Sequence, residues 1–360
     1  MAEILGIGIS HFPGFVNPDE QMSVRIKQIL TSERIPPELK DPANWPEPMR
    51  QEWATDEGAS FAAEHRRQFV AGARRIRAAI DDFQPDAVVI FGDDQYENMR
   101  EDLITPFCVY IMPRFELRPY IWQRTDVPQP NIWNEPKDTT FCVEGQPQIA
   151  RFLTKAAIAA NFDMSYAYRL RYPEAEGLGH AFNFTMVYLD YDRTGWHHPI
   201  VPVAINAYGS NVIRNKGLVS HLIGEDGEQE SDPPAASPRR YFELGQALAR
   251  ALKRSPWRTV LIGTSSWSHA FLTEKHHYVY PDVVADRQRF EDLRSGNYLA
   301  WRDLSLQELE EAGQHEVLNW MPMVGAMHEL GQKASYCEFI ESWLMNSCKC
   351  SAIFPPAPVP

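Results

Sequence analysis

The sequence is poor in cysteine and has no long apolar run. Its 360 residues include five cysteines, an odd number without the spacing of a disulfide framework, which is typical of a reduced cytoplasmic protein. The first residues lack the basic and apolar segments of a secretion signal. No stretch approaches the roughly 20 apolar residues of a membrane-spanning helix. We therefore expect a cytoplasmic protein that has no membrane partner.

Positive charge is also scarce. The chain carries 35 lysines and arginines against 48 aspartates and glutamates, which gives a formal net charge of -13. A surface of this charge repels phosphate backbones, so nucleic acid is not expected as a partner. The same surface would repel an acidic substrate, unless the pocket carries local arginines.

Apolar sequence is abundant, at 44% of the residues, which is enough to bury a large core. Apolar, β-rich runs predict buried strands at Ile4–Ser10, Asp86–Phe91, Phe107–Met112, Ile200–Tyr208 and Thr259–Trp267. Apolar residues at helical spacing predict helices at about Ala59–Phe83, Pro147–Ala160, Arg240–Lys253 and Leu306–Leu330. Strands that alternate with helices predict a single α/β domain over residues 1–360, with a central mixed sheet flanked by helices on both faces.

Three segments interrupt this alternation. Residues 17–53 and 114–140 carry prolines together with tryptophans, too many aromatic residues for solvated linkers. We expect both to cover a pocket as lids, since long ordered excursions tend to be functional. Residues 225–239 are acidic and then rich in proline and serine, which predicts a mobile surface loop.

Polar side chains follow three of the predicted strands. The first strand ends in Ser10 and His11, the second runs into the acidic turn "GDDQYE" that ends at Glu97, and a later one runs into "GTSSWSH", which ends at His269. In open α/β sheets, ligands bind beyond the carboxyl ends of the strands. A single histidine at such a place is commonly a hydrogen-bonded structural residue. Two histidines with an acidic turn indicate a site.

Five motifs occur in order along the chain: "GIGISHFPG", "VVIFGDDQYEN", "GLGHAFNF", "GTSSWSHAFL" and "AGQHEVLNW". In this order the chain resembles the class III extradiol ring-cleavage dioxygenases, relatives of the β subunit of protocatechuate 4,5-dioxygenase, from about Ile4 to Ala326. The resemblance implies an Fe(II) cofactor. It also implies a catecholic aromatic substrate that is opened with O2 to a muconic semialdehyde-type product. We expect a homodimer or a higher homo-oligomer.

The resemblance also assigns roles to four residues. That family holds Fe(II) with two histidines and a glutamate, a ligand set that leaves positions open for catechol and O2. By matching motifs, His11 resembles the first histidine ligand and Glu316 resembles the glutamate. His269 resembles the catalytic acid/base. His180 resembles the histidine beyond the metal ligands that supports bound substrate or oxygen.

The second histidine ligand of the family has no counterpart, because this chain has Gln95 at that place in "GDDQ". A neutral amide is a poor ligand for Fe(II). From His65 to the end of its predicted helix is about 25 Å at about 1.5 Å per residue. The following strand returns roughly that distance, which would bring His65 level with Gln95. His65 is therefore a candidate ligand, with Asp94 and Gln95 as alternatives. A site without a third protein ligand is a further alternative, and His65 would then be a core histidine bonded to Asp93 or Asp94.

Further residues are candidates for the surroundings of the metal. Asp93 is expected to orient ligands or to bind the turn backbone. Tyr96, Trp267 and Tyr208 could line the substrate pocket, although aromatic packing explains them as well. Two other functions stay open because of Gln95: a hydrolase that uses a metal-bound water on the same scaffold, and a non-catalytic paralogous subunit.

Overall fold

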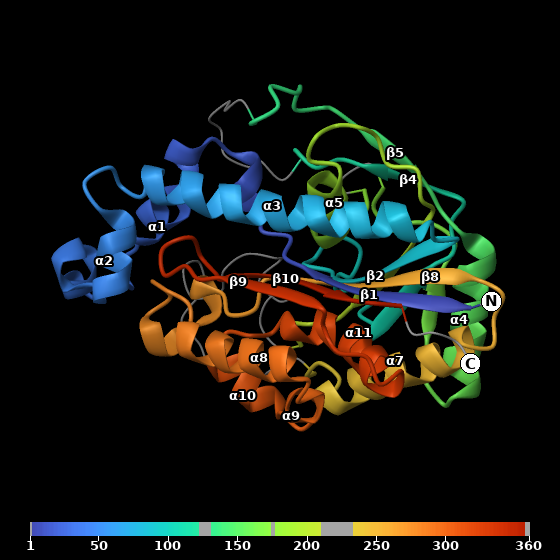
Figure 1. The fold of residues 1–360 in the computed structure, drawn as a ribbon. Coiled ribbons are helices and arrows are strands. Elements are labelled where there is room, and N and C mark those ends of the chain that lie inside the picture. Colours follow the sequence, from blue (N-terminus) through green and yellow to red (C-terminus); the bar gives the residue numbers. More distant parts are fainter. Residues whose placement is uncertain (1, 122–130, 174–176, 210–232, 357–360) are drawn as a thin grey trace.

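The structure, a computed structural model, describes residues 2–121, 131–173, 177–209 and 233–356. Its centre is a mixed sheet of eight strands in the order β6-β3-β7-β2-β8-β1-β10-β9 (Figure 1). Four neighbouring strands of this sheet run parallel: β7 (Ile200–Ile205), β2 (Ala87–Asp93), β8 (Arg258–Thr264) and β1 (Glu3–Ile9). Their residues are almost all buried, as expected of parallel strands covered on both faces.

Shorter strands extend the sheet on both sides of this parallel centre. On one side, β3 (Phe107–Tyr110) is antiparallel to β7, and β6 (Ser165–Ala167) forms the edge. On the other side, β10 (Lys349–Phe354) is antiparallel to β1, and β9 (Tyr336–Ile340) forms the second edge. A separate hairpin consists of β4 (Arg114–Leu117) and β5 (Phe141–Glu144).

Helices cover both faces of the sheet (Figure 1). One face packs against α3 (Ala59–Phe83) and α5 (His180–Leu189). The other packs against α4 (Pro147–Ala159), α7 (Pro238–Leu252), α9 (Tyr298–Arg302) and α11 (Val317–Glu329), with α8 (Val283–Ser295) and α10 (Leu306–Glu311) beside them. The predicted α/β fold with a mixed, doubly covered sheet is therefore confirmed. No helix in the described ranges combines the length and apolar character that crossing a bilayer requires.

One predicted helix is wrong in its extent. The segment Leu306–Leu330 is two helices, α10 and α11, that are separated by a turn. Gly313 lies in this turn at a φ of 64°, and a Cβ there would lie 2.5 Å from the Thr273 hydroxyl oxygen. A positive φ is not helical, so the helix ends before this residue, and glycine fits there because it carries no Cβ. The break places Glu316 at the start of α11.

The expected lid at 17–53 contains α1 (Val24–Ile29), α2 (Glu47–Trp53) and several short 3-10 turns. Its Trp45 and Met49 are buried. The Glu52 carboxylate accepts hydrogen bonds from the backbone of Trp343 and Leu344, which ties α2 to the turn before β10. Of the expected lid at 114–140, the described part holds the β4–β5 hairpin, and residues 122–130 lie outside the described residues. Most of the loop expected at 225–239 also lies outside them.

Candidate metal centre

Four buried side chains meet where the parallel strands end. His11, Asp93, His180 and Glu316 each offer one possible ligand atom, and these atoms all lie within 4.8 Å of one another. His11 follows β1 by two residues and Asp93 is the last residue of β2. His180 begins α5, and Glu316 directly precedes α11. The cluster thus occupies the place where open α/β sheets bind their ligands.

Glycines allow α11 to approach the sheet closely enough to bring Glu316 to the strand ends. A Cβ at Gly8 of β1 would lie 2.1 Å from the ring of Trp320, and a Cβ at Gly263 of β8 would lie 2.8 Å from the Trp320 backbone. These distances are shorter than any real carbon contact. The helix that begins at Glu316 can therefore rest directly on β1 and β8 because both strands lack a side chain there.

Each histidine of the cluster is oriented by a bond to the nitrogen that faces away from the centre. His11 Nδ1 lies 3.2 Å from the Thr264 hydroxyl, which lies 2.6 Å from the Thr185 hydroxyl of α5. His180 Nδ1 lies 2.5 Å from Glu97 Oε1, and the same oxygen accepts the His180 backbone N–H at 3.0 Å. Metal-binding histidines are commonly fixed in this way, by a hydroxyl, carbonyl or carboxylate on the second nitrogen.

The remaining nitrogens point at the two carboxylates. His11 Nε2 lies 3.6 Å from Asp93 Oδ1 and 3.4 Å from Glu316 Oε2. His180 Nε2 lies 3.6 Å from Asp93 Oδ2. The Tyr208 hydroxyl donates to Glu316 Oε1 and, at 3.1 Å, approaches Asp93 Oδ2. The four groups therefore share one small volume, with Tyr208 bridging the carboxylates.

Burial and mutual charge shift the protonation of these groups. Burial raises the pKa of Glu316 well above its usual range, and the Asp93 carboxylate acts in the same direction. Burial alone would lower the pKa of His180, but the Glu97 and Asp93 carboxylates outweigh it and raise this pKa to about 10. Burial lowers the pKa of His11 to about 4. The carboxylates of Asp93 and Glu97 thus make their side of the cluster negative, which favours the positively charged form of a neighbouring group.

His269, the predicted acid/base, borders the cluster without belonging to it. Its Nε2 lies 3.4 Å from Glu316 Oε1, and its Nδ1 donates to the Trp267 carbonyl at 3.0 Å. This hydrogen bond leaves Nε2 of the neutral ring without a proton and directed at the centre. Burial lowers the pKa of His269 to about 3, so the ring is neutral at pH 7.

The cluster fits a divalent metal ion of the iron type. Two imidazoles and two carboxylates are a donor set that suits Fe(II), and atoms within 4.8 Å of one another can surround an ion that binds nitrogen at about 2 Å. Glu316 Oε2 is buried and has no hydrogen-bond partner among the described residues. A buried carboxylate oxygen is costly without a proton, a donor or a metal to satisfy it.

The structure does not bring His65 to this cluster. His65 is buried in α3, where its ring stacks on Phe15 and packs at a tilt against Phe61, each at 5.5 Å between ring centres. The helix does turn His65 toward the sheet, as its apolar stripe predicts. However, neither Asp93 nor Asp94 is its partner, because both ring nitrogens lack a hydrogen-bond partner in the described part of the chain.

The other residues of the "GDDQ" turn have separate tasks. Both oxygens of Asp94 are engaged with the backbone N–H groups of Glu97, Asn98 and Met99, so this carboxylate holds the turn. The backbone of half-buried Gln95 donates to the Glu97 carboxylate. Asp93 reaches the centre, where it accepts a hydrogen bond from Asn319 at 2.7 Å.

Of the three aromatic residues proposed for the pocket, only Tyr208 contacts the cluster. Tyr96 donates from its hydroxyl to Glu101 on the surface side of the turn, and Arg100 lies over its ring. Trp267 is packed among aromatic side chains of the core, edge-on to Trp301 and Trp320. The sequence named Asp93 as a possible ligand or neighbour of the ligands and placed His180 beyond them, and the structure brings both into the four-residue cluster. The signals were an acidic residue at a strand end and a histidine at a helix start.

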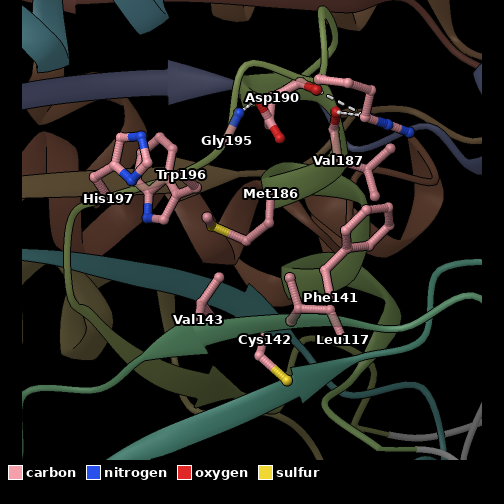
Figure 2. A pocket seen from close by; sticks show the side chains of 11 residues that line it. Leu117, Phe141, Cys142, Val143, Met186, Val187, Asp190, Gly195, Trp196 and His197 are labelled. Atoms are coloured by element: carbon pink, nitrogen blue, oxygen red, sulfur yellow. Dashed lines mark hydrogen bonds between the residues drawn. The ribbon is translucent and has the colours of Figure 1, made fainter.

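A separate cavity of about 240 Å³ lies at the far end of α5 (Figure 2). Its apolar wall includes Leu117 and Val143 of the hairpin and Met186 of α5. Its polar groups serve the local fold, because Asp190 accepts the Gly195 N–H at 2.9 Å and Arg193 donates to backbone carbonyls. None of the four cluster residues lines this cavity.

The sequence was compared with protein-family models and with curated proteins. No family model matches the chain. It is 26% identical over 193 residues to a 2,3-dihydroxyphenylpropionate/2,3-dihydroxicinnamic acid 1,2-dioxygenase of Paraburkholderia xenovorans (strain LB400), which covers 54% of this chain and 46% of that protein. A protein of the same name from Azotobacter vinelandii (strain DJ / ATCC BAA-1303) is 24% identical over 214 residues, 59% of this chain and 52% of that protein.

The chain spans about half the length of the curated relatives it matches. These relatives all carry the name 2,3-dihydroxyphenylpropionate/2,3-dihydroxicinnamic acid 1,2-dioxygenase, and the likeness supports an oxygenase-type enzyme. The buried cluster of His11, Asp93, His180 and Glu316 is a place in the described part of the chain that could hold a metal ion.

Proposed function

We propose that this protein is an Fe(II)-dependent extradiol dioxygenase of the class III type, which opens a catecholic aromatic ring with O2 to a muconic semialdehyde-type product. The observation that carries the proposal is the buried meeting of two histidines and two carboxylates at the strand ends, where Glu316 Oε2 has no hydrogen-bond partner among the described residues. The names of the relatives supply the reaction class.

His11, His180, Asp93 and Glu316 would hold the iron. Bound there, Fe(II) supplies open positions for catechol oxygens and O2 and makes the catechol hydroxyls more acidic. Within this proposal His180 takes the place that the sequence offered to His65, Asp94 or Gln95. The carboxylate of Glu97 keeps Nε2 of His180 directed at the centre.

His269 would move the proton. Because Nδ1 donates to the Trp267 carbonyl, Nε2 is the acceptor and faces the volume beside Glu316. It can accept the proton of a substrate hydroxyl and return it as the ring opens. Tyr208 holds the Glu316 and Asp93 carboxylates in place through its hydroxyl. The surrounding burial excludes bulk water, which limits competing reactions.

The test combines metal analysis with O2 uptake. The protein is purified without oxygen, loaded with Fe(II), freed of excess metal, and offered a panel of catechols in an oxygen electrode. We expect stoichiometric iron, and O2 consumption coupled to a yellow ring-opened product. Metal without O2 uptake would point to a hydrolase on this scaffold. Neither metal nor O2 uptake would point to a non-catalytic subunit.

Variants then link the activity to the cluster. His11→Ala and Glu316→Ala should each lose most of the iron while the far-ultraviolet circular dichroism stays unchanged. His197→Ala, a histidine at the separate cavity, serves as the matched control. Stoichiometric iron in His11→Ala would refute the assignment.

A further inference from the structure

Arg25 is an arginine without an acidic partner. It lies on α1, and the described residues offer it no hydrogen bond or ion pair; its Nε is fully buried. Two other partly buried arginines differ in this respect, because Arg66 pairs with Asp19 and Arg193 pairs with Glu135. A guanidinium removed from water is costly unless an anion accepts its N–H groups. Arg25 is therefore poised to receive an anion.

The position of Arg25 connects it to the metal centre through two aromatic contacts. Its guanidinium carbon lies 4.6 Å from the centre of the Phe271 ring. Phe271 packs edge-on against His269, with 5.3 Å between ring centres. His269 in turn contacts Glu316. Arg25 thus lies beyond His269, with the rings of Phe271 and His269 between its guanidinium and Glu316.

A second buried basic side chain, Lys349, lies on the same His269 side, and burial lowers its pKa to about 7. In the described chain its Nζ contacts only neutral oxygens, those of the Met345 carbonyl at 3.3 Å and of Ser347 at 2.5 and 3.0 Å. It lies 4.0 Å above the ring of Phe12, the residue after His11. The pairing of Ile9 with Ser351, continued by two residues, places Lys349 opposite His11.

The cluster is buried on both sides, with slight exposure around it. Asp93 and Glu97 are completely buried and His180 keeps 5% of its surface exposed, while Phe12, His269 and Phe271 keep 6 to 8%. A substrate that enters past these rings would meet the cations first and the cluster behind them. The chain as a whole is acidic, so this local positive charge is what an acidic substrate would require.

We propose that Arg25, with Lys349 as a second positive charge, binds a carboxylate on the side chain of the substrate, which makes Arg25 a specificity-determining residue. This inference rests on the proposed function, since it places the catechol ring between Arg25 and the metal cluster. A guanidinium binds a carboxylate through two parallel hydrogen bonds, which fixes orientation as well as affinity. The substrate class is then an aromatic acid with a short carboxylate side chain.

Binding of an inert probe tests the subsite without turnover. The affinities of 3-phenylpropanoate and of the neutral 3-phenylpropanamide are measured by calorimetry on the iron-loaded protein. Arg25→Met should weaken binding of the acid roughly 10- to 100-fold, the loss expected for a hydrogen bond to a charged group, and leave the amide unchanged. Lys349→Met should also weaken binding of the acid. An equal loss for both probes would overturn the proposal, because it would indicate a merely structural role.

Arg75→Met is the matched control. Arg75 is also stacked on an aromatic ring, 4.4 Å above Tyr336, but it lies on the exposed surface of α3 away from the site. Arg75→Met removes one positive charge, as Arg25→Met does, and should change the affinity for neither the acid nor the amide. Loss of acid binding in Arg75→Met as large as in Arg25→Met would assign the effect to net charge and refute the subsite.

Turnover separates this inference from the proposed function. With 3-(2,3-dihydroxyphenyl)propanoate, Arg25→Met should raise KM and largely keep kcat, while the kinetics of the corresponding amide stay unchanged. If the wild-type protein opens neither ring but binds the acid probe through Arg25, the proposed function fails and the subsite stands. If the wild-type protein opens the acid and the amide equally well, and Arg25→Met alters the kinetics of neither, the subsite fails and the function stands.

Discussion

His11 and Glu316 come from opposite ends of the chain, yet His11 Nε2 lies 3.4 Å from Glu316 Oε2. The contact exists because β1 and β8 are neighbours and α11 rests on their glycines. Among the described residues Glu316 Oε2 has no hydrogen-bond partner, and His11 Nε2 otherwise faces only Asp93 Oδ1, at 3.6 Å. The pair is therefore the core of the candidate metal site, and the first prediction concerns which histidine joins it.

We predict that His180→Ala loses iron and that His65→Phe retains it. His180 Nε2 faces Asp93 in the cluster, whereas His65 lies between phenylalanine rings, where a phenyl ring of similar size can replace it. Iron per chain, measured by mass spectrometry after anaerobic loading, distinguishes the two. Iron lost from His65→Phe and kept in His180→Ala would restore His65 as the ligand.

The second prediction separates proton transfer from metal binding. His269→Ala should keep its iron and lose turnover by roughly 10²- to 10⁴-fold, the usual contribution of a positioned acid or base. His269→Gln, which can still hydrogen-bond but cannot exchange a proton at neutral pH, should be equally slow. Parallel measurement of iron content and of kcat decides the matter. A His269→Ala protein devoid of iron would make this residue a ligand instead.

The third prediction concerns stability and the clamp at Glu52. Burial raises the pKa of Glu52 to about 7, although the backbone N–H groups of Trp343 and Leu344 favour its charged form. The folded state thus binds this proton more tightly than the unfolded state, whose value is near 4.5. The free energy of unfolding must fall as the pH rises between these values, and must level off above pH 7.

Glu52→Gln removes this dependence, because an amide does not titrate. From pH 5.5 to 8 the wild-type protein should lose roughly 2 kcal/mol more stability than the variant, at about 1.4 kcal/mol per pKa unit. Urea unfolding at both pH values gives the difference. The same loss in both proteins would show that another group is responsible.

The sequence predicted the fold well because its signals were local and repeated. Apolar runs marked β1, β2, β7 and β8, and an apolar stripe marked α3 to the residue. The C-terminal strands β9 and β10 were not predicted, because β10 pairs with β1, which is far away in sequence, and β9 pairs with β10. The break before α11 was not predicted because the apolar spacing continues across Gly313, whose left-handed backbone (φ 64°) ends the helical run.

Only the part of the candidate site that lies at the strand ends could be predicted from the residues themselves. His11 and Asp93 follow strands, and Glu316 and His269 came from the resemblance in motifs. The position of His65 was estimated from lengths along one helix and one strand, which fix its level but not what fills the space beside it. Phe15 and Phe61 occupy that space. It is His180 that joins the cluster, because α5 begins next to the end of β2, where a Cβ at Gly92 would lie 3.0 Å from Ala181.

The last prediction concerns the hydroxyl that joins the two carboxylates. Tyr208 donates to Glu316 and approaches Asp93 Oδ2 at 3.1 Å, so Tyr208→Phe leaves both carboxylates in place but removes their common donor. Groups that orient metal ligands typically contribute about 10- to 100-fold to metal affinity or activity. We expect a loss of this size in iron affinity or in kcat/KM, measured by competition with a chelator and by O2 uptake. Tyr241→Phe is the control, because its buried hydroxyl donates to the Asn206 carbonyl at 2.8 Å and contacts no carboxylate of the cluster. If both variants lose iron affinity equally, the effect belongs to the packing of this region, and Tyr208 does not act on the centre through its hydrogen bonds.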